Sequence, residues 1–242
     1  MTHKILQDRT IMVAGGTGNV GRYVVNALLG EGAQVVVPSR SEQKIAELRS
    51  FVDPKTSARL LTLAGNIGDA ASAERVRDDI MHLVDRLDGV VATLGRMVPA
   101  PSILRVPVSD LMASLDGYLV GHFVVARTYI PLLSPEASYT FINGPLAYNP
   151  LFPGTGLVSI ATAAQAMLTR VIIKELQPVG PRVNEVVLYT SFGWGDKARG
   201  SAAVSQQEVG TYVAYLASWQ AAQIRGQTIH LNSREALEHL TH

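Results

Sequence analysis

Cysteine is absent from all 242 residues of the sequence. This absence excludes disulfide bonds and thiolate catalysis, and it suits a reducing compartment, so we expect a cytoplasmic protein. An excess of charge of one sign is also lacking, because 21 lysines and arginines oppose 20 acidic residues. The basic residues form no stripe along the chain, and we therefore expect no nucleic-acid partner.

Metal-ligand spacing and long hydrophobic runs are missing as well. The six histidines are scattered, so we predict no metal site. Residues 1–9 are polar and lack the apolar core of a signal peptide. Later apolar runs are broken by polar residues before they reach the length needed to cross a bilayer. We expect no membrane partner.

A glycine cluster near the N-terminus is the most informative feature that is present. Gly15, Gly18 and Gly21 separate an apolar run at residues 10–14 from a helical stretch at residues 22–29. This order is typical of a strand, a tight turn and a helix whose free N–H groups bind a phosphate. The cluster predicts a dinucleotide-binding site, with a glycine-rich surface turn as the alternative.

Short apolar runs alternate with helical patterns along the whole chain. Strands are expected at residues 10–14, 34–38, 59–64, 89–94, 139–143, 182–188 and 228–231, and helices near 19–30, 41–50, 70–87, 108–133, 156–177 and 206–224. This alternation favours parallel strands joined by right-handed crossovers. We predict one Rossmann-like NAD(P)-binding domain over residues 1–242, an α/β doubly wound sheet of about seven parallel strands with helices on both faces.

Two of the expected helices, near 108–133 and 156–177, lack a polar face. A helix on the outside of a doubly wound sheet normally shows such a face to solvent. These two are apolar or small nearly all the way round, so their second side needs a cover. A homodimer or homotetramer built on these helices would supply it. A deep intramolecular core is the alternative.

The end of the second expected strand indicates which dinucleotide binds. An NAD-binding chain of this fold carries a carboxylate there, which accepts hydrogen bonds from the ribose hydroxyls. This sequence instead has Ser39, a donor, and Arg40, whose guanidinium suits a phosphate. We predict that NADP(H) is favoured over NAD(H), with a solvated strand-end arginine as the alternative.

Over residues 8–232 the chain resembles the short-chain dehydrogenase/reductase family. Residues 14–21 are similar to the family's TGxxGxxG turn, 88–95 to its D-x-x-V-N-N-A-G stretch, 119–123 to N-L-x-G-x-F, 180–186 to G-I-R-V-N-x-V and 226–229 to G-Q-x-I. The resemblance implies a dinucleotide cofactor, and a small molecule as a further ligand. The expected cofactor contacts are Gly15, Thr17, Gly18, Asn19, Val20, Gly21, Ser39, Arg40, Asn66, Ile67, Thr93, Leu94, Gly95 and Asn143.

The residues that carry the family's carbonyl chemistry are missing. The sequence contains no Y-x-x-x-K, and alignment places Val158 and Thr162 at the tyrosine and lysine, Gly144 at the serine and Tyr118 at the asparagine. A tyrosine moves protons near neutral pH only when a nearby cation lowers its pKa from about 10. Two functions stay open: a cofactor-binding or regulatory pseudoenzyme, and an atypical NADP(H)-dependent oxidoreductase that uses other acid–base residues.

Three side chains are candidates for such acid–base work, although the catalytic residues are otherwise unknown. We expect Tyr118 and His122 one turn apart on one helix face, with His122 titrating near neutrality. Tyr148 follows the fifth expected strand, where ligands bind in this architecture. Packing alone is the alternative for each of them. Trp194 lies in the loop that covers the substrate in this family.

Overall fold

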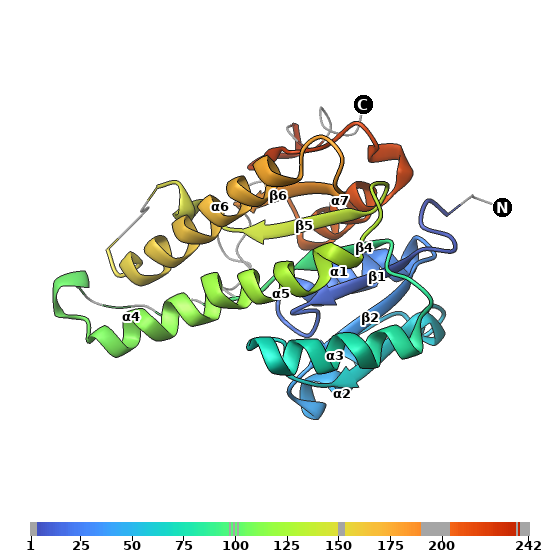
Figure 1. Cartoon of the computed structure of the whole chain (residues 1–242), viewed down its shortest axis with the longest axis horizontal. Coiled ribbons are helices and arrows are strands. Elements are labelled where there is room, and N and C mark those ends of the chain that lie inside the picture. The colour runs from blue at the N-terminus through green and yellow to red at the C-terminus, as the bar shows by residue number, and fades with distance from the viewer. Residues whose placement is uncertain are drawn as a thin grey trace.

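The computed structural model describes residues 4–96, 98, 100, 102–149, 153–189, 204–235 and 237. Its centre is a seven-stranded sheet in the order β3-β2-β1-β4-β5-β6-β7 (Figure 1). All neighbouring strands are parallel. The strands are β1 (Thr10–Ala14), β2 (Gln34–Ser39), β3 (Leu60–Ala64), β4 (Gly89–Ala92), β5 (Ser138–Asn143), β6 (Arg182–Leu188) and β7 (Thr228–Leu231). The predicted doubly wound sheet is confirmed.

Helices cover both faces of this sheet. The helices are α1 (Gly21–Gly30), α2 (Glu42–Phe51), α3 (Ala70–Leu83), α4 (Val108–Leu115), α5 (Gly121–Tyr129), α6 (Gly156–Leu176) and α7 (Gln206–Ala217). On one face, Val24 of α1, Leu48 of α2 and Val213 of α7 share a core with the sheet. On the other face, Ile80 of α3 and Val125 of α5 belong to a second core. Both sides of the central strands are therefore buried, as their continuous valine runs require.

The helix expected near 108–133 is not uniform. A π-helical turn, Asp116–Val120, separates α4 from α5, and a 3₁₀ turn, Ile130–Leu132, ends the segment. A π turn is wider than an α turn, so the helix faces before and after it are not in the same register. The hydrophobic periodicity of the sequence predicted one continuous helix over this segment.

The outer sides of α5 and α6 carry exposed apolar side chains beside charged ones such as Arg127 and Arg170. Val125 and Ala166 lie inside the core, at 0% and 3% exposure, whereas Phe123 and Met167 are 48% and 55% exposed. The intramolecular core therefore covers only one side of each helix. In Figure 1 the α4–α5 segment and α6 run side by side on this face of the molecule.

Helix α6 is also long and apolar enough to cross a membrane by length and composition, with a mean hydropathy of 1.6 in its best window. The expectation that no such stretch exists was therefore wrong. A core helix passes the same test, and α6 carries buried polar residues that pack toward the sheet, namely Thr162, Gln165 and Thr169.

Candidate functional site

The turn between β1 and α1 brings backbone close to backbone. Gly15 has a φ of +83°, and a Cβ on it would lie 2.3 Å from the carbonyl oxygen of Thr93. A Cβ on Gly21 would lie 2.2 Å from the carbonyl oxygen of Gly15. No side chain caps the start of α1. The N–H groups of Asn19, Val20 and Gly21 bond to no described residue, whereas those of Arg22 and Tyr23 bond to the Gly18 and Val20 carbonyls. Free N–H groups at the start of a helix, at the carboxyl edge of a sheet, are the arrangement that binds an anion.

The ends of β2 and β3 lie next to this turn. The Ser39 hydroxyl is buried and lies 3.5 Å from the Thr17 hydroxyl, while Arg40 is exposed and makes no ion pair with any described residue. Asn66 uses its side chain locally, accepting from the Gly68 N–H and donating to Asp69. Ile67 is buried in the core.

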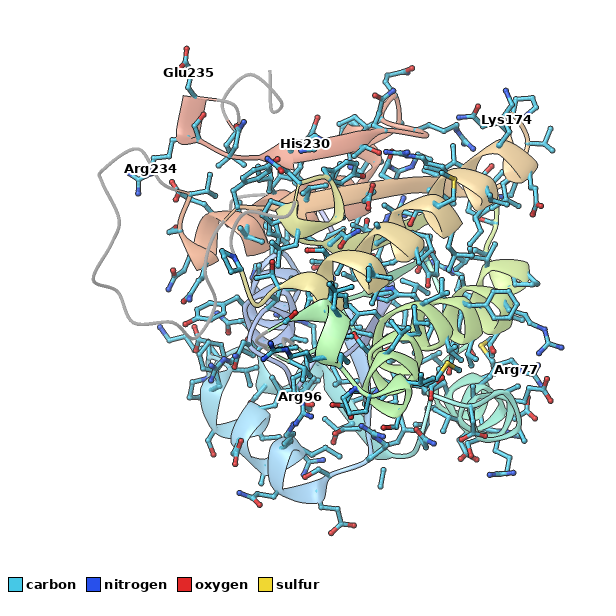
Figure 2. All side chains as sticks on the ribbon, turned by 90° about the vertical axis from the view of Figure 1, so that its left-hand side faces the viewer. Arg77, Arg96, Lys174, His230, Arg234 and Glu235 are labelled. Atoms are coloured by element: carbon cyan, nitrogen blue, oxygen red, sulfur yellow. The ribbon has the colours of Figure 1, made fainter. Side chains whose placement is uncertain are left out.

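A cavity of about 410 Å³ opens at the carboxyl ends of β1, β4, β5 and β6. Its lining combines residues of the glycine turn, the loop after β4, the π turn, the end of β5 and α6: Gly18, Asn19, Val20, Thr93, Leu94, Gly95, Arg96, Tyr118, Ile142, Asn143, Gly144, Gln165 and Leu188. Figure 2 shows the molecule from this edge, with the labelled His230 near the top of the view and Arg96 in its lower half. Ligands bind at this edge in open α/β sheets.

The structure places seven of the expected cofactor contacts on the cavity wall: Gly18, Asn19, Val20, Thr93, Leu94, Gly95 and Asn143. The other expected contacts do not belong to the lining. They lie in the glycine turn or at the carboxyl ends of β2 and β3: Gly15, Thr17, Gly21, Ser39, Arg40, Asn66 and Ile67. Sequence reasoning missed Arg96, Ile142, Gln165 and Leu188 as lining residues. Gln165 carried a signal, since a glutamine is unusual in so apolar a helix.

The residues aligned with the family's tyrosine and lysine are buried. Val158 and Thr162 are each 3% exposed, and the Thr162 hydroxyl donates to the Val158 carbonyl at 2.6 Å. Gly144 faces open space, with no heavy atom within 4 Å of a Cβ built on it. Tyr118 lines the cavity with its ring against Gly95, and burial raises its pKa to about 12. At neutral pH this phenol is protonated and can donate a hydrogen bond.

His122 does not lie in the cavity, and it does not titrate near neutrality as expected. The side chain is fully buried, its ring lies 5.7 Å from that of Phe141, and its Nε2 is 3.2 Å from the Leu94 carbonyl oxygen. Burial disfavours the charged imidazole and lowers its pKa to about 4. The periodicity showed the helix face but not the packing that removes water from it.

Tyr148 belongs to a polar cluster behind the cavity. Its hydroxyl donates to the carboxylate of Glu185, which is 0% exposed in β6. Asn143 and Thr228 donate to the same carboxylate at 2.8 and 3.2 Å. Burial, and then the Glu185 carboxylate, raise the pKa of Tyr148 to about 12. Sequence reasoning missed Glu185, although a carboxylate inside an apolar strand was a visible signal.

The loop after β6 is described only up to Tyr189, whose hydroxyl lies 3.1 Å from His230 Nδ1. Trp194, expected to cover the pocket, lies outside the described residues.

The sheet order, the glycine turn and the cavity together define a Rossmann-type nucleotide-binding fold. Residues 15–190 match the short-chain dehydrogenase family model described as Enoyl-(Acyl carrier protein) reductase. The chain therefore belongs to the short-chain dehydrogenase/reductase family.

Individual relatives are distant. The chain is 26% identical over 245 residues to the uncharacterized oxidoreductase YhxC of Bacillus subtilis, covering 95% of this chain and 85% of that one. It is 28% identical over 214 residues to a 3-phenylpropionate-dihydrodiol/cinnamic acid-dihydrodiol dehydrogenase of Escherichia coli, covering 84% and 74%.

Solved structures share the fold at still lower identity. A short-chain dehydrogenase/reductase of Serratia marcescens has a TM-score of 0.82 at 22% identity, over 93% of this chain and 97% of that one. The RhlG/NADP active-site complex of Pseudomonas aeruginosa has a TM-score of 0.81 at 20% identity, over 96% and 98%.

The burial of His122 predicts a specific loss of stability in mild acid. Its folded pKa lies below its unfolded value of 6.5, so the unfolded chain takes up a proton first and stability falls between pH 6.5 and 4. The difference between the two pKa values corresponds to a loss of roughly 3 kcal/mol in the free energy of unfolding. Urea unfolding at several pH values measures this loss. His122→Gln keeps a donor for Leu94 and should flatten the slope, whereas His82→Gln, at an exposed site, should not; identical slopes in all three proteins would contradict it.

Proposed function

We propose that this chain is an NADP(H)-binding member of the family that lacks the standard carbonyl-reducing machinery and acts as a cofactor-binding or regulatory pseudoenzyme. One observation carries the proposal. The glycine turn lines the cavity at its β1 side, while Val158 and Thr162, which align with the family's tyrosine and lysine, are buried and carry no proton-transfer group. This contrast supports a protein that binds the cofactor without the family's proton transfer.

The residues present fit a dinucleotide phosphate at two places. The N–H groups of Asn19, Val20 and Gly21, which bond to no described residue, and the positive end of the α1 dipole suit a pyrophosphate. Ser39 and Arg40, which forms no ion pair within the described part of the chain, offer a hydroxyl and a guanidinium for the 2′-phosphate. When bound, the nicotinamide cofactor supplies hydride chemistry, and the protein supplies orientation and electrostatics. The structural neighbour RhlG of Pseudomonas aeruginosa forms a complex with NADP, which supports this choice.

The alternative function is an atypical NADP(H)-dependent oxidoreductase. Tyr118 favours it, because this side chain lines the cavity and keeps its proton at neutral pH. Its hydroxyl would serve as a hydrogen-bond donor to a substrate oxygen. Burial raises its pKa instead of lowering it toward neutrality, so its proton transfer would be slow. Tyr148 does not belong to the cavity lining, and its hydroxyl already donates to Glu185.

Cofactor preference is tested by reversing the charge at Arg40. Arg40→Asp replaces phosphate attraction by repulsion and should weaken NADPH by about 2 kcal/mol, roughly thirtyfold, with little effect on NADH. Calorimetric titration of both cofactors measures it. Lys55→Asp makes the same charge change at an exposed site before β3 and should leave both affinities unchanged. Equal losses for NADPH and NADH in the Arg40 variant would contradict the assignment.

Turnover on simple carbonyl compounds separates the two functions. Without a general acid near the substrate oxygen, about 10²–10⁴-fold of rate is lost, so no NADPH oxidation above background is expected with aldehydes and ketones. Gly144→Ser combined with Val158→Tyr and Thr162→Lys restores the missing groups, and open space at Gly144 admits the serine. A trace of activity in that variant alone supports the proposal. Robust wild-type turnover, abolished by Tyr118→Phe, would support the oxidoreductase instead.

We also propose that the chain forms a homodimer or homotetramer through the outer sides of α5 and α6. Phe123 and Met167 are half exposed there, and a surface of this kind is normally covered. Phe123→Glu with Met167→Glu should yield monomers in sedimentation velocity at micromolar concentration. Leu83→Glu removes an equally exposed apolar side chain from α3 and should leave the assembly intact. A monomeric wild-type protein would refute the idea.

A further inference from the structure

Two carboxamides, Asn143 and Gln165, wall the cavity at its β5 and β6 side. With the phosphates at α1 and over β2, an extended dinucleotide reaches this side with its nicotinamide end. The family's usual groups there donate hydrogen bonds to a substrate oxygen. The hydrogen bonds of these two amides show which atoms they offer instead.

Asn143 has both amide hydrogens engaged. Its Nδ2 donates to the Thr162 carbonyl at 3.2 Å and to Glu185 Oε1 at 2.8 Å. Because a backbone carbonyl only accepts, the amide cannot be turned the other way round. Its Oδ1 accepts from the Gly144 N–H at 2.8 Å and keeps a second lone pair. The atom that Asn143 can offer a ligand is therefore an acceptor.

The side-chain amide of Gln165 is also held in one orientation. It is 1% exposed, and its Nε2 donates to the Ile142 carbonyl at 3.0 Å, which fixes its orientation. Its Oε1 has no hydrogen-bond partner among the described residues. A buried acceptor without a partner is costly, and a bound N–H removes that cost.

The buried charge next to Asn143 is negative, which suits a ligand that donates hydrogen bonds. Glu185 is fully buried directly behind Asn143 and forms no ion pair with a described residue. Its hydrogen-bond donors are neutral side chains. The ionisable side chains that line the cavity are Tyr118 and Arg96, which come from the π turn and the loop after β4. The buried Glu185 carboxylate favours a hydrogen-bond donor beside Asn143, while Arg96 brings its positive charge to the cavity from the loop after β4.

We propose that this end of the cavity binds a nitrogen group that donates hydrogen bonds, a primary amide or a protonated amine, rather than a carbonyl oxygen or a carboxylate. The proposal rests on the proposed function, since it concerns the nicotinamide side of the same pocket. The N–H donor has two sources: the carboxamide of the cofactor itself, or a separate amine or amide ligand. Gln165 is the specificity-determining residue in both.

The first arm of the test is calorimetric binding of NADP⁺ and of its 3-acetylpyridine analogue, in which a methyl ketone replaces the carboxamide. If the cofactor supplies the N–H group, the wild type binds the analogue about tenfold more weakly. Gln165→Leu removes that difference. Thr169→Val keeps it, because this hydroxyl, one turn further on α6, binds only the Gln165 backbone carbonyl and does not line the cavity.

The second arm compares benzylamine with acetophenone and benzoate, each titrated with and without NADP⁺. If a separate ligand supplies the group, benzylamine binds at least about tenfold more tightly than the other two, and Gln165→Leu abolishes the preference. The wild-type comparisons alone decide the matter if that variant does not fold. A preference for N–H in neither arm, or tighter acetophenone or benzoate, overturns the proposal. Failure of NADP⁺ to bind refutes the proposed function, while the arm without cofactor still tests this one.

Discussion

The close approach of the β1–α1 turn to the end of β4 is the constraint on which the site depends. Gly15 lies where any side chain would strike the carbonyl of Thr93, and Gly21 where it would strike the carbonyl of Gly15. These contacts place the start of α1 and the loop after β4 on opposite sides of one hollow. The cavity exists because backbone, rather than side chains, forms this corner.

A polar cluster around the buried Glu185 holds together the β5, β6 and α6 side of the site. Asn143 at the end of β5 binds the backbone of α6 and the buried carboxylate of β6, and Tyr148 and Thr228 complete the carboxylate's shell. A buried carboxylate without a cation is stable only when donors satisfy it in this way. The cluster fixes the wall of the cavity beside Gly144, which aligns with the family's serine, and it holds the amide of Asn143 in one orientation.

Membership of a dehydrogenase family and the absence of Y-x-x-x-K from the sequence are compatible in physical terms. Cofactor binding uses backbone N–H groups and the ends of strands, which many sequences supply once the fold forms. Proton transfer needs particular side chains with tuned pKa values. Here the Thr162 hydroxyl donates to the Val158 carbonyl, and burial raises the pKa of the Tyr118 phenol, which is protonated at neutral pH.

The sequence by itself determined the sheet, the glycine turn and the missing Y-x-x-x-K, because apolar periodicity, glycine spacing and residue identity are local properties. It also pointed to Asn143 and to the loop after β4 as parts of the cavity. Only the tertiary structure decided that His122 is buried and neutral, that Val125 and Ala166 face inward, and that Glu185 and Gln165 stand behind and on the cavity wall. Burial and hydrogen-bond partners arise between elements far apart in the chain, so no local pattern carries them.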